Sequence, residues 1–324
     1  MLMKSLAIKT IAACSLIAVL MAFSPARVCP DPFHSPDVEY LATINTYGGR
    51  GIETPADIHI DAYDDLYLLD VRAGAVYIFT DLAQESAMIS KGEGLVVPSL
   101  ITVSDKGEIY AVEIAAGNKS ARIGVFDFAR KRIKTFDLQG FTGAGHFIPH
   151  AIAMDGNNRI YLAGDTLPGV VMLDEKGAFL RMIRPEDKFG DDPPKPVIIR
   201  DIAVDAKGTI YLLSESMGRV YVYNQKFEFM FKFGKKGGVA GTLSRPRGIA
   251  VDQKGRIFIS DYMRHSISIY EPDGTYIKEF GGRGIGHTWF NYPQAIAVSE
   301  NNVLAVGDLF NKRVELFRII DQDT

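Results

Sequence analysis

Short apolar segments that end in a polar turn recur along the whole chain. In the clearest copy, large and small apolar residues alternate through Gly248-Ile249-Ala250-Val251, and Asp252, a turn and the apolar Ile257-Phe258-Ile259 follow. Two short strand-like runs separated by a turn predict a β-hairpin. The same pattern is found six times, at residues 55–70, 98–113, 149–165, 199–214, 246–261 and 293–308.

Each of the six turns contains a residue type that tolerates a positive φ angle, as a tight turn requires. A third strand-like segment follows each hairpin, as at 220–223, and a fourth follows it in the middle copies, as at 276–280. Each copy is therefore predicted to be a four-stranded antiparallel sheet. The predicted positive-φ residues are Asp64, Gly107, Asn158, Gly208, Gly255 and Asn302.

The spacing of the copies indicates the architecture. The corresponding isoleucines are separated by 43, 51, 50, 47 and 47 residues, a period typical of propeller blades, and little of the chain has a helical pattern. In the first strand, isoleucine alternates with alanine, which suits a sheet buried between two neighbouring sheets. The sequence therefore predicts an all-β, six-bladed β-propeller. The six isoleucines are Ile58, Ile101, Ile152, Ile202, Ile249 and Ile296.

The motif GGRGI, found at 48–52 and again at 281–285, follows from this architecture. The sixth copy ends after its third strand, near residue 320, so we expect segment 39–46 to supply its outermost strand. GGRGI would then be the connection from an outer strand to the next inner strand in both places. A phosphate-binding loop would need a helix after the glycines, and no helical pattern follows.

Residues 246–284 and 293–317 look like NHL repeats, and 39–320 as a whole resembles a six-bladed NHL β-propeller. The resemblance implies a binding module for protein or RNA, a sensor domain or, in one branch, an amidating lyase with three histidines on zinc at the channel mouth. Of the matching mouth positions only His150 is a histidine. Lactonase-like propellers hold a divalent ion with carboxylates, for which Asp57 and Asp201 are the candidates.

The N-terminal residues have the pattern of an export signal. Lys4 and Lys9 precede the uncharged run 10–23, and the small residues at 24–26 predict cleavage after Ala26. The predicted organisation is a signal peptide at 1–26, a linker at 27–38 and the propeller at 39–324, in the periplasm or on the cell surface. Attachment to the membrane is expected only if the leader is uncleaved or Cys29 is lipidated.

Net charge argues against a nucleic-acid partner. The chain has 36 basic and 39 acidic residues, and removal of Lys4 and Lys9 with the leader increases the acidic excess.

The loops before the inner strands and after the second strands are expected to surround one channel mouth. Arginine there suggests a site for an anionic group such as a peptide carboxylate. We therefore predict a module that binds or scaffolds a protein or peptide of the cell envelope, with no catalytic residue and no cofactor. The alternative is a divalent-metal-dependent lyase or lactone hydrolase at the same mouth. The candidate binding residues are Arg50, Ser99, His146, His150, Arg200, Arg247, Arg283, Trp289 and Gln294.

Two further features carry structural predictions. A polar residue ends each second strand, and since every blade has one we expect it to accept hydrogen bonds from a loop rather than to bind an ion. The charged, proline-rich insertion 184–197 is expected to project as a stiff loop. The strand-end residues are Asp70, Glu113, Asp165, Ser214, Asp261 and Asp308.

Overall fold

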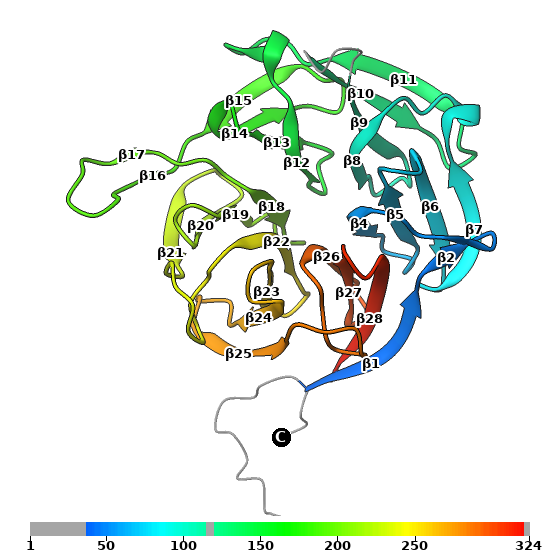
Figure 1. Ribbon diagram of the computed structural model, residues 1–324. Coiled ribbons are helices and arrows are strands. Elements are labelled where there is room, and N and C mark those ends of the chain that lie inside the picture. Colours follow the sequence, from blue (N-terminus) through cyan, green and yellow to red (C-terminus); the bar gives the residue numbers. More distant parts are fainter. Residues whose placement is uncertain (1–36, 115–119, 321–324) are drawn as a thin grey trace, which may run out of the picture. The chain divides into compact units, whose positions relative to one another are not determined.

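The computed structural model describes residues 37–114 and 120–320. The strands of these residues form six four-stranded antiparallel sheets and two short two-stranded ribbons. All of them belong to one unit, Ser35–Thr324, and Figure 1 shows the six sheets of this unit arranged around a channel. The predicted six-bladed propeller is therefore confirmed. The predicted leader, 1–26, and Cys29 lie outside the described residues.

The four strands of each blade are numbered here from the channel outwards. The innermost strands are β4 (Pro55–Ile60), β8 (Pro98–Val103), β12 (Pro149–Met154), β18 (Asp201–Val204), β22 (Pro246–Val251) and β26 (Pro293–Val298). The second strands are β5 (Leu66–Asp70), β9 (Ile109–Ile114), β13 (Ile160–Gly164), β19 (Ile210–Ser214), β23 (Ile257–Asp261) and β27 (Val303–Asp308).

The two outer strands complete each blade. The third strands are β6 (Ala75–Thr80), β10 (Ala121–Phe126), β14 (Leu167–Leu173), β20 (Arg219–Tyr223), β24 (Ser266–Tyr270) and β28 (Arg313–Ile320). The outermost strands are β7 (Gln84–Ile89), β11 (Arg132–Asp137), β15 (Phe179–Ile183), β21 (Phe229–Phe233), β25 (Tyr276–Gly281) and β1 (Asp37–Ile44). Two short 3-10 turns, η1 (Lys91–Glu93) and η2 (Ala144–His146), lie in loops between blades.

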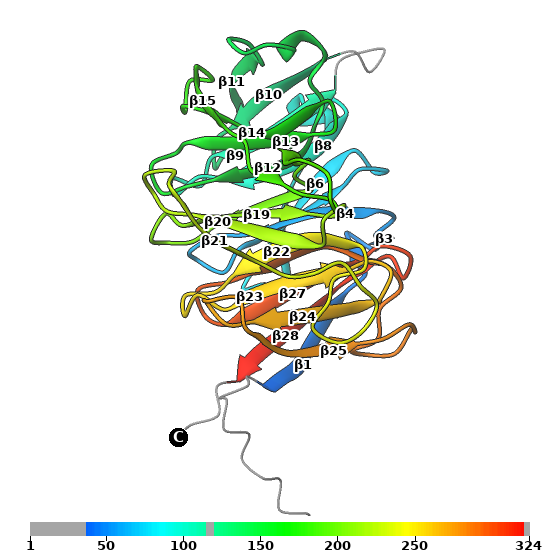
Figure 2. The ribbon, with the colours of Figure 1, turned by 90° about the vertical axis from the view of Figure 1, so that its left-hand side faces the viewer.

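The N-terminal strand closes the ring, as predicted. β1 pairs antiparallel with β28, with Tyr40 opposite Phe317 and Ile44 opposite Val314, so blade six is built from both ends of the described chain. Figures 1 and 2 both show these two strands side by side. The innermost strands of blades six and one are also in contact. β1 thus covers the outer edge of β28, which would otherwise be exposed.

The sequence also identified the hairpin turns correctly. All six residues predicted to take positive φ do so, with values between 58° and 84°, and Asp64, Asn158 and Asn302 do this without being glycine. Short polar side chains accept this conformation at low cost.

Apolar clusters between neighbouring blades form the core. Ile296 of β26 packs in one cluster with Ala250 of β22, and Ile249 packs in the next with Ala203. The large side chain of one inner strand thus fills the space that the methyl group of its neighbour leaves open, as the alternation predicted. Each fully buried isoleucine stabilises the interface by roughly 1.5–3 kcal/mol.

The two GGRGI motifs connect blades in both places, yet their conformations differ. At 48–51 the glycines form the tip of a ribbon made by β2 (Thr46–Tyr47) and β3 (Arg50–Gly51), with Gly48 and Gly49 at positive φ in open space. At 281–284 the glycines instead lie under the indole of Trp289, which a Cβ on Gly282 would meet at 2.8 Å. The longer connection to β26 makes room for this side chain.

The insertion at 184–197 carries the second ribbon, β16 (Glu186–Asp187) with β17 (Lys195–Pro196), and reaches outwards from the ring beside β20 and β21 in Figure 1. Its base is held by the buried Asp187, whose Oδ2 accepts hydrogen bonds from Arg219 Nη1 at 2.7 Å and from the Tyr221 hydroxyl at 2.8 Å. Lys232 Nζ donates to Oδ1 at 2.8 Å. The projecting loop is therefore anchored to the outer strands of blade four.

None of the described residues forms a helix with the length and apolar character of a membrane span.

Candidate functional site

A cavity of about 260 Å³ lies in the channel and extends along the inner strands from the end where they begin. The residue that follows the proline of each repeat, or Ile199 in blade four, varies from blade to blade and is arginine in two of them. Five of the six residues at this position line the cavity, while Ser99 lies outside the lining and donates its hydroxyl to Val112 O at 3.3 Å. The five are Ala56, His150, Arg200, Arg247 and Gln294.

Arg200 and Arg247 give this mouth a positive charge. The Nε of each is buried and has no hydrogen-bond partner. Burial, followed by the neighbouring charge of Arg200, lowers the pKa of Arg247, so the two guanidinium groups are close enough to repel each other. Glu215 lies 3.3 Å from Arg247 Nη1 and accepts from Arg245 Nε at 2.7 Å, so one carboxylate faces two arginines.

The opposite opening of the channel has the other sign. Its cavity of about 440 Å³ is lined by residues of the hairpin turns, and no arginine or lysine is among the described residues that line it. An anionic ligand is therefore expected at the arginine end. The acidic lining residues are Asp61, Asp105, Asp155, Asp205, Asp252 and Glu300.

His150 serves the fold and the cavity together. Its Nε2 lies 2.7 Å from the carbonyl oxygen of Ile199 in the next blade, and because a carbonyl only accepts, Nε2 carries the proton. Nδ1 is buried without a hydrogen-bond partner, 3.2 Å from the exposed carboxylate of Asp165. Burial lowers the pKa of His150, so the neutral ring presents Nδ1 as an acceptor.

Asp57 and Asp201 tie blades together just inside the mouth. Asp57 Oδ2 accepts from the backbone N of Ile101 at 2.9 Å, and Asp201 Oδ2 accepts from that of Ile249 at 2.8 Å, in each case on the next inner strand. Burial raises the pKa of Asp57 to about 8 and that of Asp201 to about 6. Each carboxylate satisfies a backbone N–H that faces the channel.

The mouth does not fit the metal sites of the enzymatic alternative. Zinc needs three protein ligands with an open position, and the His150 Nε2 is already bound to a carbonyl. The Asp57 and Asp201 oxygens that face the next blade are likewise bound to backbone N–H groups. Across the described residues, no three His, Cys, Asp or Glu side chains are grouped to hold a metal ion.

Four other predicted residues lie outside the cavity lining. Arg50 is exposed on the β2–β3 ribbon, and His146 is exposed in η2. Arg283 lies in the loop after β25, where its backbone bridges to Phe290. Trp289 is 51% exposed and packs on glycines of the same loop. The cavity therefore gathers His150, Arg200, Arg247 and Gln294, whereas the other four do not line it.

The strand-end residues accept hydrogen bonds from loops, as expected. Asp70 accepts from the backbone N of Thr54 before the inner strand and from that of Ala73 after the second strand, both at 3.1 Å, and Asp261 is bound in the same way. Asp165 is the exception, because its side chain is 82% exposed and faces His150.

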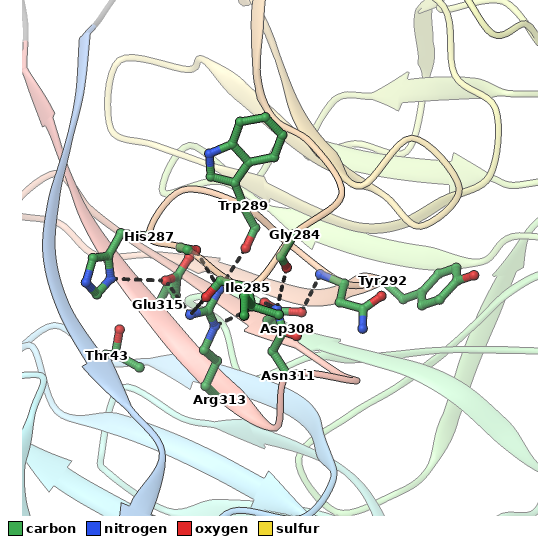
Figure 3. A network of polar contacts seen from close by, with 12 residues as sticks. Thr43, Gly284, Ile285, His287, Trp289, Tyr292, Asp308, Asn311, Arg313 and Glu315 are labelled. Atoms are coloured by element: carbon green, nitrogen blue, oxygen red, sulfur yellow. Dashed lines mark hydrogen bonds and ion pairs between the residues drawn. The ribbon is translucent and has the colours of Figure 1, made fainter.

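In blade six the strand-end residue, Asp308, belongs to a larger network of polar contacts, shown in Figure 3. Asp308 accepts from Arg313 Nε at 3.1 Å, and the same guanidinium donates to the carbonyls of Ile285 and Trp289 at 3.0 and 2.7 Å. Arg313 therefore holds the loop between β25 and β26 against the blade. The indole of Trp289 points away from the network in Figure 3, as does the ring of Tyr292.

The sequence interpretation missed an aromatic group at the edge of the mouth. The guanidinium groups of Arg245 and Arg247 lie over the Tyr262 ring, 5.4 and 5.3 Å from its centroid. The Tyr292 ring lies beside that of Tyr262, with the two planes tilted by 33° and the centroids 4.4 Å apart. Tyr292 comes directly before the first proline of β26, and Tyr262 directly after the strand-end Asp261. Both residues are adjacent in sequence to positions that the repeat places at the mouth, so the sequence could have identified them.

Comparison with known proteins agrees with the fold. Residues 243–270, which contain β22, β23 and β24, match the NHL repeat. No curated protein matches the chain. A structural genomics protein of unknown function from Bacteroides thetaiotaomicron has a TM-score of 0.66 at 14% identity, over 88% of this chain and 76% of its own.

Other solved structures share the fold at similarly low identity. An auxiliary nutrient binding protein from Bacteroides ovatus has a TM-score of 0.61 at 16% identity, over 88% of this chain and 77% of its own. Virginiamycin B lyase from Staphylococcus aureus has 0.55 at 12%, over 88% of this chain and 100% of its own. The chain therefore contains a segment that matches the NHL repeat, within a six-bladed β-propeller fold.

Proposed function

We propose that this NHL-repeat propeller is a binding module that holds a carboxylate of a peptide or protein partner between Arg200 and Arg247. The observation that carries the proposal is the pair of buried Nε atoms without partners on the cavity wall. A buried donor left unsatisfied costs about 1–3 kcal/mol, which a bound oxygen would recover. Two guanidinium groups held close together in the free protein also favour a ligand of opposite charge.

The shape and polarity of the mouth favour the end of a chain or a side chain over a folded surface. A cavity of about 260 Å³ accommodates a carboxylate with one or two neighbouring groups. Beside the two donors, Nδ1 of His150, 3.2 Å from the exposed Asp165 carboxylate, is an acceptor for one N–H of the ligand. A peptide terminus offers a carboxylate and an amide N–H within a few bonds of each other.

The N-terminal pattern supports a place in the cell envelope for this binding, in the periplasm or at the cell surface, and the acidic net charge supports a partner other than nucleic acid. The partner in this account is a protein or peptide that meets the propeller after export.

Binding to pools of random pentapeptides tests the proposal. One pool has free C-terminal carboxylates and the other has C-terminal amides, with fluorescence anisotropy as the readout for the purified protein, residues 27–324. The free-acid pool is expected to bind, and Arg200→Ala with Arg247→Ala to weaken it about tenfold or more. Arg72→Ala is the control, because Arg72 lies outside the cavity lining, in the loop after the second strand β5, and pairs with Glu53 at 2.8 Å. Equal binding of both pools to the unmodified protein would refute the proposal.

A further inference from the structure

A row of aromatic side chains, here called the aromatic ladder, leads away from the channel mouth across blades five and six. It consists of Tyr262, Tyr292 and Phe310, with ring centroids 4.4 Å apart in the first pair and 4.9 Å in the second. Arg247 lies over Tyr262, so the ladder begins at the proposed carboxylate site. It ends at Phe310, which is 57% exposed.

The fold itself does not require this row. The position after the strand-end residue, occupied by Tyr262 in blade five, is Val71 in blade one and Glu215 in blade four. The position before the inner-strand proline, occupied by Tyr292 in blade six, is Thr54 in blade one. Aromatic residues occur at these equivalent positions only where they extend one continuous surface from the arginines, which distinguishes the ladder from the repeated framework.

We infer that the aromatic ladder binds the residues that precede the carboxylate of the same partner. The whole site would then recognise a free C-terminus that is preceded by apolar side chains. The inference rests on the proposed carboxylate site. Each step from Arg247 through Tyr262 and Tyr292 to Phe310 is between 4.4 and 5.3 Å. An extended chain advances about 3.3–3.6 Å per residue, so about four residues span the ladder.

The ring contacts favour apolar side chains over sugars as the occupant. Sugars stack on open aromatic faces, whereas Tyr262 has arginines and Tyr292 against it, and Tyr292 contacts His265 at 4.5 Å as well as Phe310. Those contacts leave ring edges and the exposed part of Phe310 for a ligand. Edges of this kind suit aliphatic and aromatic side chains, which pack edge-to-face.

A peptide array with individual sequences tests the inference. It carries random pentapeptides with free carboxylates, each duplicated as its amide, and is probed with the labelled protein and with a Tyr292→Ala, Phe310→Ala variant. Phe, Leu, Ile or Met should be enriched at the second to fourth positions from the C-terminus. The best of these free peptides should bind the ladder variant about fivefold or more weakly, as truncated aromatic anchors do. Phe128→Ala, which removes an aromatic residue 87% exposed in the turn after β10, should bind them as the unmodified protein does.

The outcomes separate the two proposals. The inference is overturned if binding depends on the carboxylate but shows no enrichment of apolar residues. It is also overturned if the ladder variant binds the enriched peptides as well as the unmodified protein does. Both results leave the proposed function in place. Binding that ignores the carboxylate overturns the proposed function. Preference for an acidic oligosaccharide such as oligogalacturonate over every peptide also overturns the inference. The single variants Tyr292→Ala and Phe310→Ala keep the test valid if the double variant does not fold.

Discussion

Replacement of Glu315 by Gln isolates the cost of one buried charge. Glu315 lies on β28 with its side chain fully buried, and both of its carboxylate oxygens have no hydrogen-bond partner. Arg313 Nη1 is 3.2 Å away and His287 Nδ1 3.7 Å away (Figure 3). Burial raises the pKa of Glu315 from 4.5 to about 7, although Arg313 opposes the shift.

The sign of the effect follows from proton binding. Between pH 4.5 and 7 the folded protein keeps a proton on Glu315 that the unfolded chain has lost, so the free energy of unfolding falls as the pH rises through this window. The raised pKa lowers the free energy of unfolding by about 3 kcal/mol at pH 8 and by less than about 1 kcal/mol at pH 5. Glu315→Gln cannot ionise, so it should be about as stable as the unmodified protein at pH 4 and more stable at pH 8.

Denaturant unfolding at pH 4, 5, 6, 7 and 8 measures this difference directly. Asp57 and Asp201 also have raised pKa values and are present in both proteins, so their contributions cancel. Glu39→Gln on β1 is the control, because this glutamate is exposed in the same blade, and its profile should parallel that of the unmodified protein. A constant difference between the Glu315→Gln variant and the unmodified protein from pH 4 to 8 would refute the reasoning.

Three further predictions test the framework. Deletion of residues 37–44 removes β1 and exposes the edge of β28, so sedimentation should show association or loss of soluble protein, and an unchanged stable monomer would contradict closure. Asp187→Asn should lower the free energy of unfolding by about 2 kcal/mol in denaturant titration and should speed proteolytic cleavage within residues 188–195. Although burial disfavours ionisation of Asp187, hydrogen bonds from Lys232, Arg219 and Tyr221 outweigh it and lower the pKa of this carboxyl, so their stabilisation is lost below pH 3.8. Gly281→Ala should cost more than about 2 kcal/mol in thermal unfolding, because φ is 107° and a Cβ would lie 2.8 Å from Phe290. Gly49→Ala, at φ 73° in open space, should cost only about 1–2 kcal/mol.

The repeat made the framework predictable from the sequence. A period near 47 residues, six turn positions and an incomplete last copy are all visible along the chain, and each corresponds to a local geometry that few residue types adopt. The closing strand could be inferred for the same reason, because a propeller blade without its outer strand would expose an edge.

The side-chain partners at the mouth were less predictable. Blades that lie side by side are nearly fifty residues apart in sequence, so the bonds from His150 to Ile199 O and from Asp57 to Ile101 N cannot be read from local spacing. Loop length also decided which predicted residues face the cavity. Arg50 and Arg283 share one motif, but a short ribbon and a longer loop place them in different surroundings away from the lining.

Side-chain NMR of the two mouth arginines tests the central claim most directly. The Nε–H signals of Arg200 and Arg247, assigned with Arg200→Lys and Arg247→Lys, should shift in a saturable way during titration with N-acetylglycine, while N-acetylglycinamide leaves them unchanged. Signals that respond to neither compound, or equally to both, would contradict a carboxylate site between these arginines.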